Sequence, residues 1–310
     1  MQSLQSLTVK TIINLVRSSL FVHKTDALTV RVGFERVSNL MKFPKFVARK
    51  ETKVAGIPAC WFTPDGHGKS KVILYFPGGG YVCGSYNTHR ALIARIARSS
   101  GYKVLAVDYR KAPEDPFPAA TDDALAAYKQ LLRDGYENIV LMGDSAGGGL
   151  VLALLQLIRK HKLNPAIGSV LLSPWTDLTL SGESMHTKKD IDPFIKPNLV
   201  EIFARRYCGE NSPRNPLISP HFADVSGFPP TLIHVGSHET LLDDSVRMAQ
   251  KMSEANVDVK LSVYKNMIHV WHFLGGIMPE ANQAIQEIGE FVKSIKVNKK
   301  TAHLDALAVY

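Results

Sequence analysis

The sequence predicts an α/β fold, in which helices cover the faces of a mainly parallel sheet. Short runs of apolar and β-branched residues alternate along the chain with longer segments of helical apolar spacing. Of the 310 residues, 45% are apolar and 21% are charged, which is an ordinary globular composition. No repeat or Gly/Ser-rich linker divides the chain. We therefore expect one large globular unit, and disordered, collagen-like and fibrous classes are excluded.

Eight segments are predicted as strands because they are short and rich in β-branched residues. In chain order they are residues 30–37, 53–62, 71–76, 103–108, 138–142, 168–172, 231–235 and 259–264. Five longer segments have the apolar spacing of helices, namely residues 88–99, 119–133, 146–161, 242–255 and 279–294. In an open parallel sheet the ligand binds outside the carboxyl ends of the strands, so we expect the site at that edge.

Two regions break this alternation, residues 1–45 and 183–215, and their patterns are helical or mixed. We expect both to form a helical cap over one edge of the sheet. Residues 1–45 would then be N-terminal cap helices. Residues 183–215 would be a cap insertion within a main domain of residues 46–298, and residues 299–310 would be a C-terminal tail.

The formal net charge of +9 comes mainly from the first 50 residues, which hold nine Lys or Arg and two Asp or Glu. A nucleic-acid-binding face would spread its basic residues over the fold, so we expect no nucleic-acid partner. Residues 11–22 have helical apolar spacing, and we predict a helix that packs on the body with its basic face in water. Contact of this helix with a membrane surface is a weaker alternative.

Features of location point to a soluble, cytoplasmic protein. No apolar run reaches the roughly 18 to 20 residues of a membrane-spanning helix, and no secretory signal pattern is recognisable at the start. The three cysteines, Cys60, Cys83 and Cys208, are odd in number and widely spaced. That spacing suits free thiols in a reducing compartment better than a disulfide framework.

A candidate nucleophile follows the fifth predicted strand. The segment Gly143-Asp144-Ser145-Ala146-Gly147 has the spacing G-x-S-x-G and lies between a strand and a helix. Small residues on either side permit a sharp, strained turn that exposes the serine hydroxyl at the sheet edge. The spacing alone is a weak signal, and its position between strand and helix is what makes Ser145 a candidate.

A serine nucleophile needs a histidine base and a carboxylate that orients it, in the chain order Ser, acid, His for this arrangement. Glu239 follows the seventh predicted strand and His269 follows the eighth. Asp243 remains an alternative acid and His272 an alternative base. A zinc pair at the two histidines is disfavoured, because no third ligand and no His-Glu-x-x-His spacing is present.

The glycine run after the third predicted strand supplies backbone N–H groups for an oxyanion. We assign the oxyanion hole to Gly78, Gly79, Gly80 and Ala146 and name the N–H groups of the last three as donors. A phosphate loop is disfavoured, because the run lacks a Gly-Lys-Ser/Thr ending and G-x-G-x-x-G spacing.

Five motifs in order resemble the hormone-sensitive-lipase-like family of α/β-hydrolases, the bacterial family IV esterases. They are the glycine run; residues 108–114 with 116–120; residues 143–148; Ser173-Pro174-Trp175-Thr176-Asp177; and the Glu239 and His269 segments. The resemblance covers residues 50–295 and implies the α/β-hydrolase fold, with an eight-stranded sheet and a helical cap. It also implies short- to medium-chain acyl esters as substrates and a possible homodimer.

The sequence departs from this family at two positions. Pro77 replaces the histidine that usually precedes the glycines, so whatever that side chain braces must be braced otherwise. Glu239 stands where the family usually has an aspartate, and a glutamate can orient the histidine if its longer stem is accommodated.

Other residues have open roles. Tyr81, Asp144 and Trp175 are weak candidates for the substrate pocket, and a packing role is about as well supported for the two aromatic residues. Asp108, Arg110 and Glu114 are expected to form a buried structural network, and nothing pairs Cys83 with a base.

These observations predict a serine carboxylesterase that needs no metal and no organic cofactor, with a small ester as its partner. An amidase that uses the same triad is the alternative within hydrolases. A non-catalytic small-molecule receptor on this fold is a third, weaker reading, because all three triad residues are present.

Overall fold

The computed structural model describes residues 26–297 of the chain. Eight strands form one sheet in the order β1-β2-β4-β3-β5-β6-β7-β8. The strands are β1 (Val47–Val54), β2 (Ile57–Pro64), β3 (Gly68–Phe76), β4 (Tyr102–Val107), β5 (Ile139–Asp144), β6 (Gly168–Leu172), β7 (Thr231–Gly236) and β8 (Val259–Tyr264). β2 is antiparallel to its neighbours β1 and β4, and the strands from β4 to β8 across the sheet are parallel. The mostly parallel sheet predicted from the sequence is thus confirmed.

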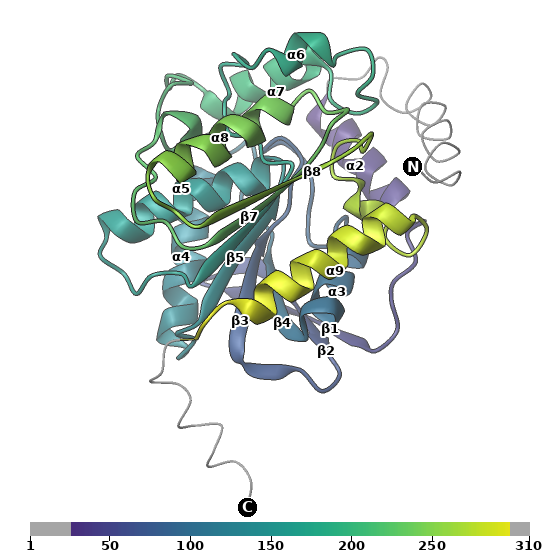
Figure 1. Ribbon diagram of the computed structural model, residues 1–310, viewed down its shortest axis with the longest axis vertical. Helices are drawn as coiled ribbons and strands as arrows, with labels where there is room; N and C mark the ends of the chain where they lie inside the picture. The colour runs from purple at the N-terminus through teal and green to yellow at the C-terminus, as the bar shows by residue number, and fades with distance from the viewer. Residues whose placement is uncertain (1–25, 298–310) are drawn as a thin grey trace, which may run out of the picture.

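Helices cover both faces of the sheet (Figure 1). One face packs against α3 (Arg90–Ser100) and α9 (Pro279–Ser294), and the other packs against α4 (Ala119–Arg133), α5 (Ala146–Lys160) and α8 (Leu242–Glu254). The central strand β3 shows why, because Leu74 and Phe76 belong to one apolar core and Ile73 and Tyr75 to the other. A strand that is apolar on both sides must be covered on both sides.

Further helices gather at one end of the sheet, towards the top of Figure 1. They are α2 (Ala27–Ser38), α6 (Ser184–Thr187) and α7 (Pro197–Cys208), and short 3-10 helices lie at η1 (Pro220–Phe222) and η2 (Trp271–Leu274). Among residues 26–297, no helix combines the length and apolar character needed to cross a bilayer. The predicted helix at residues 11–22 and the tail at 299–310 lie outside the described residues.

The prediction of a strand at residues 30–37 is wrong, because these residues form α2. Its valines suggested a strand, but the Asp26 carboxylate accepts a hydrogen bond from the Thr29 N–H (2.9 Å) and caps a helix. Ala27 and Val30 of this helix are buried in the core. Tertiary packing and the cap outweigh the weak intrinsic preference of the valines.

The strand predicted at residues 53–62 is two strands, the β1–β2 hairpin. Ala55 and Gly56 form its turn with φ of +50° and +83°, which is the geometry of the tight turns that join twisted antiparallel strands. The predicted number of eight strands was therefore reached with one strand too many at residues 30–37 and one too few in the hairpin.

Candidate active site

The turn between β5 and α5 holds Ser145 in a strained backbone conformation. Its φ of +52° and ψ of −122° lie outside the regions that residues with side chains ordinarily adopt. The Ser145 N–H donates to the carbonyl of Leu172 (2.8 Å), and the Trp175 N–H donates to the carbonyl of Ser145 (2.9 Å). These two bonds tie the strained turn to the end of β6.

Two glycines make room for this turn. A Cβ on Gly143 would lie 2.3 Å from the carbonyl oxygen of Gly147, and a Cβ on Gly147 would lie 1.9 Å from that of Phe76. Neither position can hold a side chain unless the backbone moves. The spacing G-x-S-x-G is therefore imposed here by close approach of three backbone segments.

Glu239 and His269, from the loops after β7 and β8, contact each other. The Oε2 atom of Glu239 lies 2.9 Å from Nδ1 of His269. Its Oε1 atom accepts hydrogen bonds from Ser173 Oγ (2.8 Å) and from the Gly236 N–H (2.5 Å), which fix the carboxylate. Because β5, β6, β7 and β8 are parallel, Ser145, Glu239 and His269 all lie at one edge of the sheet.

The carboxylates around His269 stabilise the cationic form of its imidazole. Burial alone would lower the pKa of His269, yet the carboxylates of Glu239, Asp192 and Asp144 together raise it above its ordinary value. Burial raises the pKa of the Glu239 carboxyl, and its hydrogen bonds with His269 and Gly236 oppose that rise. A histidine whose cation is stabilised in this way is suited to accept a proton from a hydroxyl.

The alternative acid and base make other contacts. Asp243 Oδ2 accepts a hydrogen bond from the Ser184 N–H of α6 (2.8 Å). His272 is fully buried, and its Nε2 lies 3.1 Å from Nδ1 of His234 in β7. Burial holds the pKa of His272 well below its ordinary value. Both side chains are thus engaged by partners outside the Glu239–His269 pair.

The glycine loop after β3 is tightly enclosed. Gly79 and Gly80 have φ of +123° and +62°, which favour glycine. A Cβ on Gly79 would lie 2.3 Å from the carbonyl oxygen of Cys83, and one on Gly80 would lie 2.2 Å from the ring of Phe203 in α7. The loop therefore brings its backbone, free of side chains, to the edge that carries Ser145.

Asp144 joins this loop to the nucleophile turn. Its Oδ1 accepts hydrogen bonds from Tyr75 Oη (2.6 Å) and the Gly78 N–H (3.1 Å), and its Oδ2 lies 3.1 Å from Nε2 of His89. Burial alone would raise the pKa of Asp144, but these partners, led by His89, lower it. Because the Gly78 N–H is engaged by Asp144, the remaining candidate oxyanion donors are the N–H groups of Gly79, Gly80 and Ala146.

Pro77 occupies the position of the missing histidine, and its carbonyl accepts a hydrogen bond from Tyr109 Oη (2.7 Å). Tyr109 and the Asp144–His89 contact thus secure the loop from two sides. His89 was not singled out from the sequence. It lies 55 residues from Asp144 in the chain, and no local sequence pattern predicts that the two side chains are in contact.

Tyr81 and Trp175, the candidate pocket aromatics, are both buried. The Tyr81 ring stacks on Tyr207 with centroids 3.7 Å apart and planes at 4°, and its centroid lies 6.2 Å from that of Trp175. The Trp175 Nε1–H donates to the carbonyl of Asp177 (3.2 Å). Tyr207 of α7 thus covers the Tyr81 ring, and Trp175 lies on the inner side near Tyr81 and Asp177.

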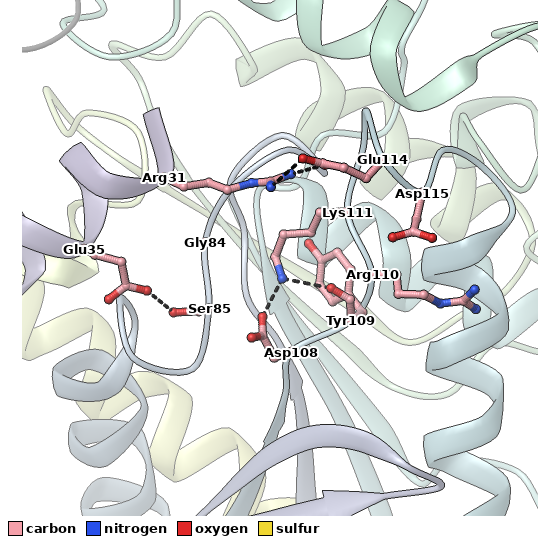
Figure 2. A pocket seen from close by; sticks show the side chains of 10 residues that line it. All are labelled: Arg31, Glu35, Gly84, Ser85, Asp108, Tyr109, Arg110, Lys111, Glu114 and Asp115. Atoms are coloured by element: carbon pink, nitrogen blue, oxygen red, sulfur yellow. Dashed lines mark hydrogen bonds and ion pairs between the residues drawn. The ribbon is translucent and has the colours of Figure 1, made fainter. Parts of the chain in front are cut away.

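Helix α2 contacts the segment that follows the glycine loop, as Figure 2 shows around Arg31. Arg31 Nε donates to the carbonyl of Val82 (2.7 Å), and its Nη2 donates to that of Ala112 (2.9 Å) and pairs with Glu114 (2.6 Å). The N–H of Val82 in turn donates to the carbonyl of Gly79 (3.1 Å). Arg31 therefore connects α2 to the loop through one intervening residue.

A cavity of about 430 Å³ lies between α2 and the loop after β4 (Figure 2).

The prediction that Asp108, Arg110 and Glu114 form one buried network is wrong. Asp108 contacts Lys111, Arg110 pairs with Asp123 (2.7 Å), and Glu114 pairs with α2, so each has a separate partner. The Arg110 and Glu114 side chains are 50% and 58% exposed. Their motif positions them near one another without joining them.

The fold and the order of these residues along the sheet define the class of α/β hydrolases. The profile of the family described as "alpha/beta hydrolase fold" matches residues 73–273. An acetyl-hydrolase of Streptomyces hygroscopicus is 39% identical over 226 residues, 72% of this chain and 76% of the relative. An esterase of Acinetobacter venetianus is 38% identical over 74% of this chain and 77% of the relative.

A solved structure agrees with these relatives. A crystal structure of an esterase from the bacterial hormone-sensitive lipase family superimposes with a TM-score of 0.91 at 39% identity, covering 95% of this chain and 99% of the other. The chain belongs to the α/β hydrolase family, among the hormone-sensitive-lipase-like esterases, and it is a carboxylic ester hydrolase. The family expected from the sequence motifs is thereby confirmed.

Proposed function

We propose that the chain is a serine carboxylesterase in which Ser145 is the nucleophile, His269 the general base and Glu239 the residue that orients it. The observation that carries this proposal is the buried 2.9 Å contact between Glu239 Oε2 and His269 Nδ1, at the sheet edge that also holds the strained Ser145. A carboxylate on Nδ1 directs the other ring nitrogen, Nε2, to accept the serine proton.

In acylation, His269 Nε2 takes the proton of the Ser145 hydroxyl as Oγ forms a bond to the ester carbonyl carbon. The carbonyl electron pair moves onto oxygen, where the N–H groups of Gly79, Gly80 and Ala146 stabilise it. As the carbonyl re-forms, the bond to the alcohol oxygen breaks and His269 delivers the proton to the leaving alcohol.

Deacylation repeats these steps with water. The water gives a proton to His269 and bonds to the acyl carbon, and the oxyanion forms again on the same donors. The bond to Ser145 Oγ then breaks, Oγ regains the proton from His269, and the carboxylic acid leaves. All atoms and protons balance through the side chains named here, so this route requires neither a metal nor an organic cofactor.

The substrates we propose are short- to medium-chain acyl esters. We also propose that residues 183–215 and the described part of residues 1–45 form a cap over the catalytic domain 46–298, whereas residues 1–25 and 298 lie outside the described residues. Two features support a small acyl group. Phe203 and Tyr207 of α7 bring bulky rings against Gly80 and Tyr81 of the glycine loop. In addition, one relative is named an acetyl-hydrolase.

We also propose where the protein is located and how it assembles. Cys60, Cys83 and Cys208 are buried and unpaired, which supports the cytoplasmic location that we propose. The resemblance implies a homodimer, and the edge strand β8, where Val263 is 47% exposed, is where we place its interface. The helix expected to pack on the body at residues 11–22, and its weaker alternative of contact with a membrane surface, both fall outside the described residues.

The first prediction concerns S145A. We expect this variant to fold with an unchanged melting temperature and to lose at least roughly three orders of magnitude in kcat, as removal of a triad nucleophile does. The measurement is hydrolysis of p-nitrophenyl esters from acetyl to palmitoyl by wild type and variant, with a maximum expected at short chains.

Controls in the same experiment separate the alternatives. An S145A protein with more than about a tenth of wild-type turnover would remove Ser145 from the nucleophile role. Faster cleavage of an amide than of its matching ester would favour an amidase. A wild-type protein that neither turns over esters nor reacts with a fluorophosphonate would favour a receptor.

A further inference from the structure

A buried carboxylate outside the triad is fastened to the turn that carries the acid. Asp192, between α6 and α7, has a fully buried side chain. Its Oδ2 accepts hydrogen bonds from the Thr240 N–H (2.9 Å) and from Thr240 Oγ1 (3.2 Å). Its Oδ1 accepts hydrogen bonds from the N–H groups of Phe194 (2.9 Å) and Ile195 (3.0 Å). Since Thr240 directly follows Glu239, Asp192 links the cap insertion to the acid.

The four groups that donate hydrogen bonds to Asp192 come from two different parts of the chain. Those of Phe194 and Ile195, two and three residues further on, form a local turn of the kind that Asp, Asn and Ser side chains support. The two donors of Thr240 lie 48 residues away in the chain, so their hydrogen bonds connect the cap insertion to the catalytic domain. One carboxylate thus organises its own segment with one oxygen and the acid turn with the other.

The negative charge of Asp192 also acts on the base. Glu239 contacts His269 directly, and the carboxylates of Asp192 and Asp144 and the imidazole of His272 act on it electrostatically. Each carboxylate favours the imidazolium form, whereas burial opposes it and a charged His272 would also oppose it. A carboxylate removed from water acts over several ångströms with little screening.

We propose that Asp192 is a positioning residue of the esterase, which fixes the Glu239 turn and stabilises the imidazolium of His269 that forms in both halves of the reaction. This proposal rests on the triad proposed above. It also gives the cap insertion a part in the chemistry, beyond enclosing the substrate.

The experiment compares kcat and kcat/KM as functions of pH for wild type, D192N, D192S and D190N. Asn and Ser both keep an acceptor for the local turn while removing the charge. Asp190 lies two residues away and is exposed, so D190N removes a charge from the same segment without removing a buried one. S145A is assayed at every pH, and thermal unfolding is recorded for each protein.

The base must be neutral to act, so activity falls below the pKa of His269. Loss of a nearby negative charge lowers that pKa, and the acid limb of kcat/KM should move to lower pH in D192N and D192S. We expect a shift of roughly half a unit to one unit, together with a loss of roughly 3- to 10-fold in kcat at the optimum. D190N should keep the wild-type limb and rate.

The outcomes are distinguishable. Folded D192N and D192S proteins with the wild-type acid limb in kcat/KM would overturn the proposal. A purely structural residue changes the stability and the maximal rate but not the pH at which activity falls. Failure of both variants to fold would also overturn it, because Asp192 would then serve the fold. An S145A protein that stays active would instead refute the proposed triad, whatever the Asp192 variants do.

Discussion

At the scale of single residues, the Glu239 carboxylate uses its two oxygens differently. Oε1 is held by Ser173 and Gly236, and Oε2 contacts Nδ1 of His269. The donors on Oε1 fix the longer stem of a glutamate at a position where the family usually has an aspartate. The contact with His269 then sets which ring nitrogen carries the proton.

E239Q is predicted to keep the fold and lose the chemistry. The amide oxygen can retain the bonds from Ser173 and Gly236, but the amide NH2 would face His269 and force its Nδ1 to act as acceptor. The proton would then sit on Nε2, and kcat should fall by roughly 10³- to 10⁴-fold with little change in KM, as for other triad carboxylates made into amides. Steady-state kinetics on a short-chain ester measure both constants.

D243N is the matched control for E239Q. Asp243 contacts the Ser184 N–H through Oδ2, and rotation of the new amide lets its oxygen keep that bond. Its kcat should stay within about 2-fold of wild type, the range of substitutions remote from the reacting groups. A larger loss in D243N than in E239Q would transfer the role of the acid to Asp243.

The sequence marks some of these residues and not others. Ser145, Glu239 and His269 can be proposed because each lies at the end of a recognisable strand or in the loop that follows it, and parallel strands deliver their ends to one edge. His89 and Asp192 cannot, because their partners lie 55 and 48 residues away and the contacts depend on how loops fold back. Local pattern carries no information about such pairings.

At the scale of elements, α2 is joined to the glycine loop by one guanidinium. R31Q should lower kcat/KM by roughly 10-fold, mainly through kcat, because release of the Val82 and Ala112 carbonyls loosens the segment that orients the oxyanion donors. Steady-state kinetics over a full substrate range separate kcat from KM.

E114Q is the control for R31Q. It removes the ion pair of Arg31 with a 58%-exposed carboxylate but leaves the bonds to the two carbonyls. Exposed ion pairs contribute little, so E114Q should remain within about 2-fold of wild type. Equal losses in the two variants would show that the ion pair, and not the bonds to the carbonyls, positions α2.

Helices with a regular spacing of apolar residues were predictable from the sequence. Elements whose type or bounds depend on a turn or a helix cap were not. The bounds of α4 and α9 agree with the predicted segments 119–133 and 279–294, because their apolar spacing is unbroken. The β1–β2 hairpin was missed because its two-residue turn, Ala55 and Gly56, hardly interrupts the surrounding strand-like residues. In α2, valines favoured a strand until packing decided otherwise.

At the scale of the whole molecule, stability depends on a buried carboxyl that the proposed reaction does not use. Asp244 of α8 is buried and accepts hydrogen bonds from the N–H groups of Thr176 (2.7 Å) and Asp177 (2.9 Å). Burial and the charge of Asp177 raise its pKa to about 7. Such a group stabilises the fold below its unfolded pKa, and that contribution is lost as pH rises through the folded value.

D244N should therefore gain stability relative to wild type as pH rises from about 4 to 7, since its amide keeps the acceptor and carries no charge. We expect the difference to grow by roughly 4 kcal/mol, the linkage free energy of a carboxyl whose pKa rises from 3.8 to about 7, or about 8 to 16 °C in melting temperature. Thermal unfolding of both proteins across this range measures it. D258N, at an exposed aspartate, is the control, and an equal change there would remove the role given to Asp244.

Three separate anchors join the segments over the sheet edge to the loops below. Arg31 of α2 holds the backbone after the glycines, Phe203 of α7 packs on Gly80, and Asp192 binds the Thr240 turn. A chimera that received these segments from a relative would import foreign anchors along with foreign pocket walls. Exchange of substrate range by grafting thus requires that both sides of each anchor be transplanted together.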